Sequence, residues 1–347
     1  MTARESSGPP RLWIANLDCD TIHARVDAAL RGGISTRDPR WQLRRAALSR
    51  VAALGSLFGL LGSPADQLLL TGDVAPERLP AVAGCARPAA ATIGKTSDGV
   101  LTMFWGGIDA AAARANDRAG WCEAGVCVPG AQVVHDLAEL NAAVAEICAD
   151  EAGTRRWVLK APFGAAGRRR VLATGTGAEA KEPLAAAQRL LKLYGRGVVE
   201  PWMERVVDFG IAAQGPEGPF RFHRLLSGHD GRFLGIDLRV PDELSEAHRA
   251  ELLAAAARVG ARLLELGHRG RFGLDGFLVR RGDATLPVIC EVNARWTFGA
   301  LTRELALRVF GADDRGRLTF VAPTRADAVP LLLPGPNGPS CAWLECD

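Results

Sequence analysis

Residues 274–295, with the sequence LDGFLVRRGDATLPVICEVNAR, decide the fold of this chain. Two strand-like runs, residues 274–280 and 286–293, flank the short segment RGDA at residues 281–284. Apolar runs joined by such a glycine-containing segment predict a β-hairpin. A turn centred near residue 283 places Asp275 opposite Glu291. The hairpin therefore brings two carboxylates side by side.

One face of this hairpin concentrates oxygen-bearing side chains. Because side chains alternate between the two faces of a strand, Asn293 shares the face of Glu291. Two neighbouring carboxylates in apolar surroundings repel each other and are costly to desolvate. A divalent cation removes that cost, and a few carboxylates together with nucleotide phosphates commonly hold Mg²⁺. The pattern predicts that Asp275, Glu291 and Asn293 bind Mg²⁺; surface acids on an exposed hairpin edge are the alternative.

A second segment, LKAPFGAAGR at residues 159–168, combines a lysine with a glycine-containing turn. Glycines let backbone N–H groups approach an anion closely, and Lys160 stands at the end of a predicted strand, within reach of a phosphate. The chain has 42 basic residues, of which only four are lysines, so a lysine here is informative. The segment lacks the GK[ST] of a Walker A motif and is followed by a strand. Taken alone, the segment is better explained as an ordinary glycine-containing turn.

A third segment is VVEPWM at residues 198–203, followed by Asp208-Phe209-Gly210. A strand that ends in an acid and an apolar tripeptide offers backbone and carboxylate groups to an adenine ring. An acid a few residues further on is placed to reach ribose hydroxyls. In isolation, an ordinary strand end with a solvated acid is the favoured explanation of the segment.

The order of these segments along the chain resembles the ATP-grasp superfamily. The resemblance covers residues 108–310 and includes the entry segment GVCVPGAQVVHDLAEL at residues 125–140. It implies an α/β chain of the α+β ATP-grasp type, in which a small N-terminal α/β layer is followed by two α+β subdomains that clasp ATP between antiparallel sheets. The expected domains are residues 1–90 (the N-terminal layer), 91–197 (linker and first subdomain with the glycine loop) and 198–347 (second subdomain with the metal site and the C-terminal tail).

The resemblance also assigns roles to individual residues. One or two Mg²⁺ ions would be held by Asp275, Glu291 and Asn293. ATP would be bound by Lys160, Gly164, Ala165, Ala166, Gly167, Glu200, Pro201, Trp202, Met203, Asp208 and Arg118. The catalytic groups would be Arg295, Lys160 and Arg224.

Two of these assignments leave alternatives open. The family usually has an early lysine entering the ATP domain, and this chain has Asn116-Asp117-Arg118 there, with Arg114 as a second candidate. Arg224 lies on a strand that borders the acceptor pocket in this fold, where it would pair with a substrate carboxylate; an exposed strand cation is the alternative. For the neighbouring His223 we expect a structural role.

The reaction implied is ATP-dependent ligation. A carboxylate is phosphorylated, and an amine or thiol attacks the resulting acyl phosphate, with amino acids or peptides as candidate substrates. Two alternatives stay open: a kinase that phosphorylates a small molecule, and a non-catalytic nucleotide-binding protein.

Composition excludes several other classes of protein. The net charge is +3, and the single Tyr and scattered Trp residues give no aromatic and basic track, so nucleic acid is not expected as a partner. The longest apolar stretch, residues 51–61, is too short to span a membrane. Without a signal peptide, and with eight cysteines in no paired spacing, the chain is expected to be cytoplasmic.

The N-terminal part of the chain reads as a small α/β layer. Strands are expected at residues 11–17 and 67–71, and Asp18, Asp20 and Asp73 would then lie at their carboxyl ends. We expect these three acids to act as caps and turn formers rather than as site residues. A homodimer through this layer is our hypothesis for the oligomeric state.

Overall fold

The structure is a computed structural model. It describes residues 10–31, 45–86, 88–92, 101–149, 155–164, 169–176, 180–228, 231–335 and 341–346. Ala165, Ala166 and Gly167 of the predicted phosphate loop lie outside the described residues. Among the described helices, none combines the length and the apolar character needed to cross a bilayer.

The N-terminal layer is built on a parallel sheet with the strand order β3-β2-β1-β4. Its strands are β1 (Arg11–Ala15), β2 (Gln67–Leu70), β3 (Ala89–Thr92) and β4 (Leu101–Phe104). Three helical segments accompany the sheet: α1 (Cys19–Leu30), α2 (Arg45–Gly55) and the 3-10 helix η2 (Phe58–Leu61). Phe58 fills the core beside the sheet, with its ring edge-on to Trp13 at 5.0 Å between centroids. The predicted strands in this layer are confirmed.

The second sheet is small and antiparallel, with the strand order β5-β8-β6-β7. Its strands are β5 (Gln132–Val134), β6 (Arg156–Lys160), β7 (Arg170–Thr174) and β8 (Gly197–Pro201). One face packs on α5 (Leu137–Ala149) and α6 (Lys181–Tyr194), whose buried Leu140, Val144 and Leu191 join Trp157 in one core. Gly195 ends α6 in the left-handed conformation, as is typical of a helix C-terminus.

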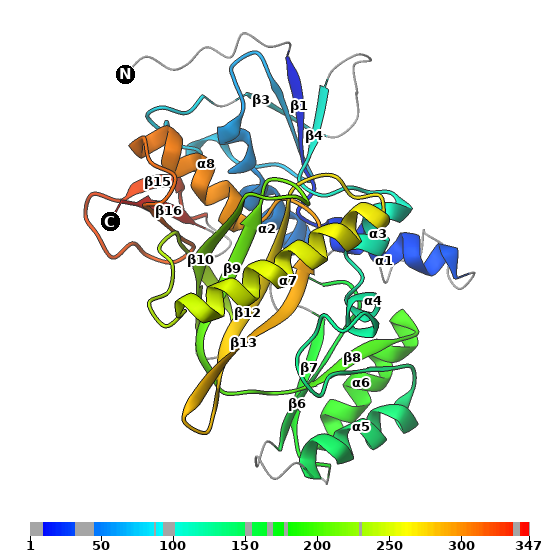
Figure 1. The fold of residues 1–347 in the computed structure, drawn as a ribbon. Helices are drawn as coiled ribbons and strands as arrows, with labels where there is room; N and C mark the ends of the chain where they lie inside the picture. Colours follow the sequence, from blue (N-terminus) through cyan, green and yellow to red (C-terminus); the bar gives the residue numbers. More distant parts are fainter. Residues whose placement is uncertain are drawn as a thin grey trace.

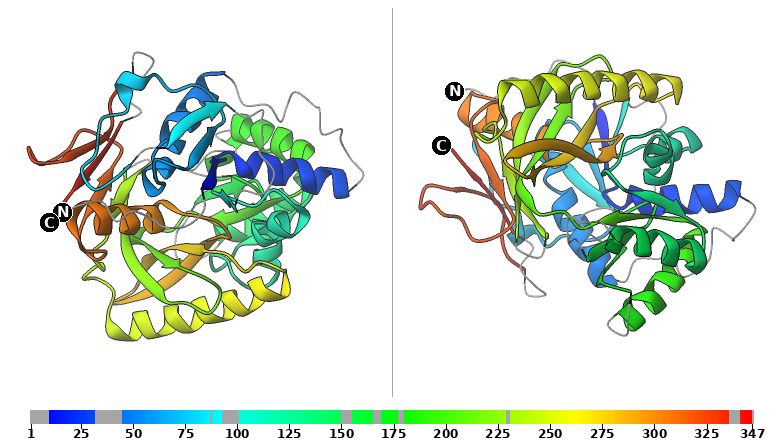
Figure 2. Two further views of the ribbon diagram at one scale, coloured as in Figure 1. Left: turned by 90° about the horizontal axis from the view of Figure 1, so that it is seen from above. Right: turned by 60° about the horizontal axis from the view of Figure 1, so that its bottom comes forward.

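The third sheet has eight antiparallel strands in the order β13-β12-β9-β10-β11-β14-β16-β15. They are β9 (Arg205–Ala213), β10 (Phe220–Ser227), β11 (Phe233–Asp237), β12 (Phe272–Arg281), β13 (Ala284–Asn293), β14 (Arg317–Thr319), β15 (Val329–Leu332) and β16 (Ala342–Glu345). The 20-residue helix α7 (Glu246–Glu265) covers its outer face. In Figure 1 the parallel layer lies above this sheet, and the small sheet with α5 and α6 lies below it. Figure 2 shows the same layers from two other directions.

The predicted hairpin is β12–β13, and Asp275 lies opposite Glu291 as expected. The two-residue turn is Gly282-Asp283, with Gly282 at φ +61°, a conformation that favours glycine. The register shifts by one residue between Asp275 and Gly276, and Cys290 has no partner opposite it on β12. This bulge offsets the pairing at the site from the pairing at the tip.

Residues 108–124 contain two short helices, α3 (Ala110–Ala115) and α4 (Arg118–Glu123). Each has its own N-cap: Asp109 accepts a hydrogen bond from Ala112 N, and Asp117 accepts one from Ala119 N. The break between the helices frees the side chain of Asn116 for other contacts.

The remaining elements are a helix that packs between two of the layers and a short 3-10 helix. The helix α8 (Phe298–Phe310) follows the hairpin and packs between the large sheet and the N-terminal layer, and η3 (Pro76–Arg78) lies in the loop after β2. The strands of the three sheets come from residues 11–104, 132–201 and 205–345. The division of the chain into domains at residues 90 and 197 stays a prediction.

Candidate active site

A cavity of about 270 Å³ is lined by residues of the two antiparallel sheets and by residues of the N-terminal layer that lie outside its strands. The hairpin contributes Asp275, Glu291 and Asn293, and the segment after it contributes Arg295. Other predicted site residues that line the cavity are Lys160, Gly164, Trp202, Asp208 and Arg118. The structure therefore brings most of the predicted site to one place, from positions up to 177 residues apart in sequence.

The predicted metal face is assembled on the hairpin. Asn293 Nδ2 donates to Asp275 Oδ2 at 3.1 Å, and Glu291 stands across the strand pair from Asp275. Burial, and then the charge of Glu291, raise the pKa of Asp275 to about 7. Two carboxylates and an amide oxygen are ligands of the kind that Mg²⁺ takes in proteins, so the donor set fits that ion.

Arg118 is the first residue of α4 and reaches directly into this face. Its guanidinium contacts Glu291 Oε1 at 2.8 Å, the carbonyl of Ala161 at 2.5 Å and the carbonyl of Gly164 at 3.3 Å. The side chain is 12% exposed, so the pair with Glu291 is shielded from water. Arg114, the alternative early cation, is exposed on α3. Of the two early cations considered from the sequence, Arg118 is the one that lines the cavity.

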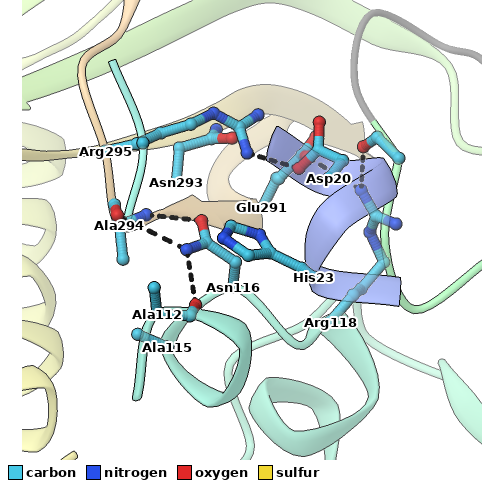
Figure 3. A network of polar contacts seen from close by, with 12 residues as sticks. Asp20, His23, Ala112, Ala115, Asn116, Arg118, Glu291, Asn293, Ala294 and Arg295 are labelled. Atoms are coloured by element: carbon cyan, nitrogen blue, oxygen red, sulfur yellow. Dashed lines mark hydrogen bonds and ion pairs between the residues drawn. The ribbon is translucent and has the colours of Figure 1, made fainter. Parts of the chain in front are cut away.

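Asn116 holds the strand end that carries the site residues (Figure 3). Its Oδ1 accepts from Ala294 N at 2.9 Å, and its Nδ2 donates to the carbonyls of Ala112 at 2.8 Å and Ala294 at 3.4 Å. Ala294 lies between Asn293 and Arg295, so this buried amide fixes the backbone of both. No role of its own was predicted for Asn116 from the sequence.

Arg295 is paired with an acid from the N-terminal layer. Its Nη1 lies 2.5 Å from Asp20 Oδ1, and both side chains are nearly buried (Figure 3). Although burial alone would raise it, the Arg295 guanidinium holds the pKa of Asp20 below its usual range. Asp20 was expected to act as a cap or turn former; it lies in the first turn of α1 and forms an ion pair with a predicted catalytic residue instead.

Of the other predicted nucleotide residues, Lys160, Trp202 and Asp208 line the cavity, whereas Glu200, Pro201 and Met203 are not among its lining residues. Lys160 Nζ lies 2.6 Å from Glu200 Oε2, since β6 and β8 are neighbours. The other carboxylate oxygen of Glu200 is buried and has no hydrogen-bond partner among the described residues. A buried acceptor without a partner is a feature that a bound donor would satisfy.

Trp202 follows β8 and is surrounded by guanidinium groups. Arg156, Arg170 and Arg205 stand 5.3, 5.8 and 5.4 Å from its ring centroid. Arg205 also pairs with Asp208 at 3.0 Å, so the predicted ribose ligand already has a cation beside it. Pro201 and Met203 flank Trp202, and Met203 packs against Phe277 and Val288 of the hairpin.

The structure does not bring Arg224 to the site. On β10, the residues that line the cavity are His223, Leu225 and Ser227, and Arg224 points to the other face of the sheet. There it forms a two-contact pair with Glu243, at 2.6 and 3.2 Å. The sequence placed Arg224 on the right strand, but its position in the alternation of that strand decides its face.

His223 lines the cavity and is almost fully buried. A Cβ at Gly210 or Gly299 would lie 2.2 or 2.4 Å from its ring, so two glycines make room for the imidazole. Burial, and then the charge of Arg303, lower the pKa of His223 to about 3, so the ring is neutral at physiological pH.

No protein-family model matches the chain, and no curated protein matches its sequence. Solved structures do match. N5-carboxyaminoimidazole ribonucleotide synthetase from Thermus thermophilus superposes with a TM-score of 0.52 at 14% identity, over 97% of this chain and 93% of that one. Carboxyaminoimidazole ribonucleotide synthase from Aspergillus clavatus, complexed with ATP, gives a TM-score of 0.50 at 9% identity, over 98% and 94%.

Both comparisons span nearly the whole chain and concern the fold. The antiparallel sheets on either side of the cavity, with an α/β layer before them, agree with that likeness. The α+β fold expected from the order of the sequence motifs is thereby confirmed: this chain shares the fold of these two synthetases.

Proposed function

We propose that this protein is an ATP-dependent ligase that converts a carboxylate into an acyl phosphate and couples it to an amine or thiol. The observation that carries the proposal is the convergence, in one cavity, of the Asp275–Glu291–Asn293 face with the cations Arg118, Lys160 and Arg295. Phosphoryl transfer from ATP needs such an arrangement, because catalysis rests on neutralising and positioning the phosphates.

The fold supports the nucleotide part of this proposal. One structural neighbour is described as complexed with ATP, and both are named as synthases of a ribonucleotide. Within the proposal, Mg²⁺ held by Asp275, Glu291 and Asn293 would neutralise charge on the transferred phosphate. Lys160 and Arg118 would contact phosphate oxygens, and the free oxygen of Glu200 would accept from the nucleotide base.

Arg295 would act on the transferring group. Its pair with Asp20 fixes the guanidinium at the wall of the cavity beside Asn293, so little reorganisation is needed when negative charge develops. Asn116 has a positioning role, because it holds the backbone between Asn293 and Arg295.

The alternative functions differ in their products. A kinase would form a stable phosphorylated product with a single acceptor, whereas a ligase releases ADP and phosphate only when both a carboxylate and a nucleophile are present. A nucleotide-binding protein without catalysis would bind Mg-ATP and release no ADP. The described face retains both carboxylates and the amide of its predicted metal set, which favours an active enzyme.

The remaining expectations belong to the same proposal. We propose that the enzyme works in the cytoplasm on small-molecule carboxylates and amines or thiols, without nucleic acid or a membrane, and that it forms a homodimer through its N-terminal layer. Residues 1–90, 91–197 and 198–347 would form its three domains.

Two measurements test the function. ADP release should require both a carboxylate and an amine or thiol, and thermal unfolding tests whether Mg-ATP binds. Mg-ATP should raise the melting temperature of the wild type, because a ligand that binds only the folded state stabilises it by mass action. A Glu291→Ala, Asn293→Ala variant should lose that response. Glu243→Gln, which changes an exposed carboxylate on the far side of the large sheet, is the matched control and should keep it. Absence of any response in the wild type at saturating nucleotide would contradict the proposal.

A further inference from the structure

Part of the cavity lining differs in chemical character from the predicted ATP and metal residues. This part is formed by apolar side chains of the N-terminal layer, the large sheet and the start of α8: Leu54, Trp105, Leu225, Phe233, Trp296 and Phe298. We call these six residues the apolar wall. None of the predicted ATP or metal ligands belongs to it.

Direct contacts join the members of the apolar wall. Phe298 stacks against Trp105 at 5.2 Å and against Phe233 at 5.9 Å between ring centroids. Leu225 pairs across the strands with Ile236, which also lines the cavity. Backbone hydrogen bonds hold Trp105 in place: its N–H donates to the carbonyl of Ile14 at 2.9 Å, and its carbonyl accepts from Trp296 N at 2.8 Å. The wall is thus a fixed surface.

Charged groups are scarce on this part of the lining. Among the described lining residues, each cation contacts another group, and Arg295 pairs with Asp20. Arg118 pairs with Glu291, Lys160 with Glu200 and Arg205 with Asp208, and Arg170 lies over the ring of Trp202.

The polar residues next to the apolar wall are uncharged. His223 is neutral, with Nδ1 buried and without a partner among the described residues, and Ser227 is a hydroxyl. A phosphorylated or multiply charged substrate would have to leave water for this surface with little compensation. An apolar group would gain from the same transfer.

We propose that the apolar wall binds one of the two co-substrates of the ligase, and that this substrate carries a bulky apolar group, aromatic or branched aliphatic, beside its reacting carboxylate or amine. The inference rests on the proposed function. The inference adds the substrate class to that function: apolar amino acids or aryl-alkyl carboxylic acids instead of phosphorylated sugars or acidic amino acids. Arg295 stands at the junction, where the reacting group of such a substrate would meet the phosphate.

Calorimetric binding with matched probes tests this inference. The probes are L-phenylalanine against L-alanine, and 3-phenylpropionate against propionate, each titrated into the full chain with and without Mg²⁺ and a non-hydrolysable ATP analogue. Each phenyl probe should bind about 10- to 100-fold more tightly than its methyl partner, as expected for burial of a ring. Ribose 5-phosphate and L-glutamate should bind more weakly than either phenyl probe.

Two variants separate the apolar wall from the rest of β10. Leu225→Lys places a charge on the wall and should weaken phenyl binding at least tenfold. Leu226→Lys makes the same change at the neighbouring residue, which faces the other side of the sheet, and should leave phenyl binding unchanged. Both variants should keep the rise in melting temperature with Mg-ATP, which shows that they fold and retain the nucleotide site.

The outcomes distinguish this inference from the proposed function. If Mg-ATP stabilises the wild type but the phenyl probes do not bind at millimolar concentration, or bind no better than their methyl partners, the apolar-substrate inference is wrong while the nucleotide site stands. Tighter binding of ribose 5-phosphate would overturn it in the same way. If Mg-ATP fails to stabilise the wild type, the proposed function itself is wrong, whatever the probes do.

Discussion

Asp275 and Glu291 face each other across the hairpin, and in the absence of a cation the folded chain has to keep both carboxylates there. The pKa of Asp275 rises from 3.8 to about 7, first because of burial and then because of Glu291. Ionising this group in the folded state is therefore unfavourable, on the order of 4 kcal/mol before screening. Because water at the mouth of the cavity screens part of this repulsion, we expect about 2–4 kcal/mol.

Asp275→Asn removes the charge and keeps an oxygen that accepts from Asn293 Nδ2. The metal-free variant should be more stable than the wild type by that amount at about pH 8. The sign follows from the folded pKa being higher than the unfolded one: the wild type gains protons on folding. The loss of stability of the wild type relative to the variant develops as the pH rises from 3.8 through about 7, and it is absent below that range.

Urea unfolding in the presence of a chelator measures this difference, and the same variant should lose stabilisation by Mg-ATP. A wild-type protein at a hundred times its dissociation constant should gain ~2.7 kcal/mol from the nucleotide. The matched control is Asp283→Asn, which changes an exposed carboxylate at the turn of the same hairpin. If Asp275→Asn is no more stable than the wild type at high pH without metal, the argument that the two carboxylates repel each other is refuted.

Three further predictions concern other parts of the site. Arg118→Ala should lower ADP release about 100-fold or more, as for a charge-stabilising donor, whereas Arg114→Ala, which changes an exposed arginine, should change it less than about twofold. Asp20→Asn leaves Arg295 without its carboxylate, so kcat should fall about tenfold or more with little change in Mg-ATP affinity; an equal loss of affinity would argue for a structural role. His223 has a folded pKa of about 3 against 6.5 unfolded, so the unfolded chain gains protons as the pH falls below 6.5. This costs about 2 kcal/mol at pH 5, and a His223→Gln variant should lose that part of the acid sensitivity in urea titrations.

The hairpin was predictable because its information is local. A turn centred near residue 283 predicts that Asp275 lies opposite Glu291, and the structure has this pair. The turn itself lies at Gly282-Asp283, and its register alone would place Asp275 opposite Cys290, so the pair also depends on the bulge. The bulge at Cys290 was not predicted, because an extra residue in one strand leaves no signal in the alternation of apolar and polar residues that we used. The face of Arg224 was missed for a related reason, since assigning a strand without its phase leaves two opposite faces open.

Contacts between distant segments could not be read from the sequence. Asp20 follows a short strand in the N-terminal layer, and nothing in its neighbourhood indicates a partner 275 residues later. Asn116 was visible only as part of the Asn-Asp-Arg segment, and its hydrogen bonds to Ala294 depend on the break between α3 and α4. The strands β14 and β16 belong to the large sheet, but no sequence motif predicted them.

The pair between Asp20 and Arg295 also limits how this protein can be engineered or can diversify. The N-terminal layer supplies the ionic partner of Arg295, which lines the cavity, so exchanging this layer for that of another protein would leave the guanidinium without its carboxylate. A chimera would need an acid at the start of its first helix, with the same offset from the first strand, to keep the guanidinium in place. Recombination at the boundary between the layers should therefore yield active enzymes only when both residues are inherited together.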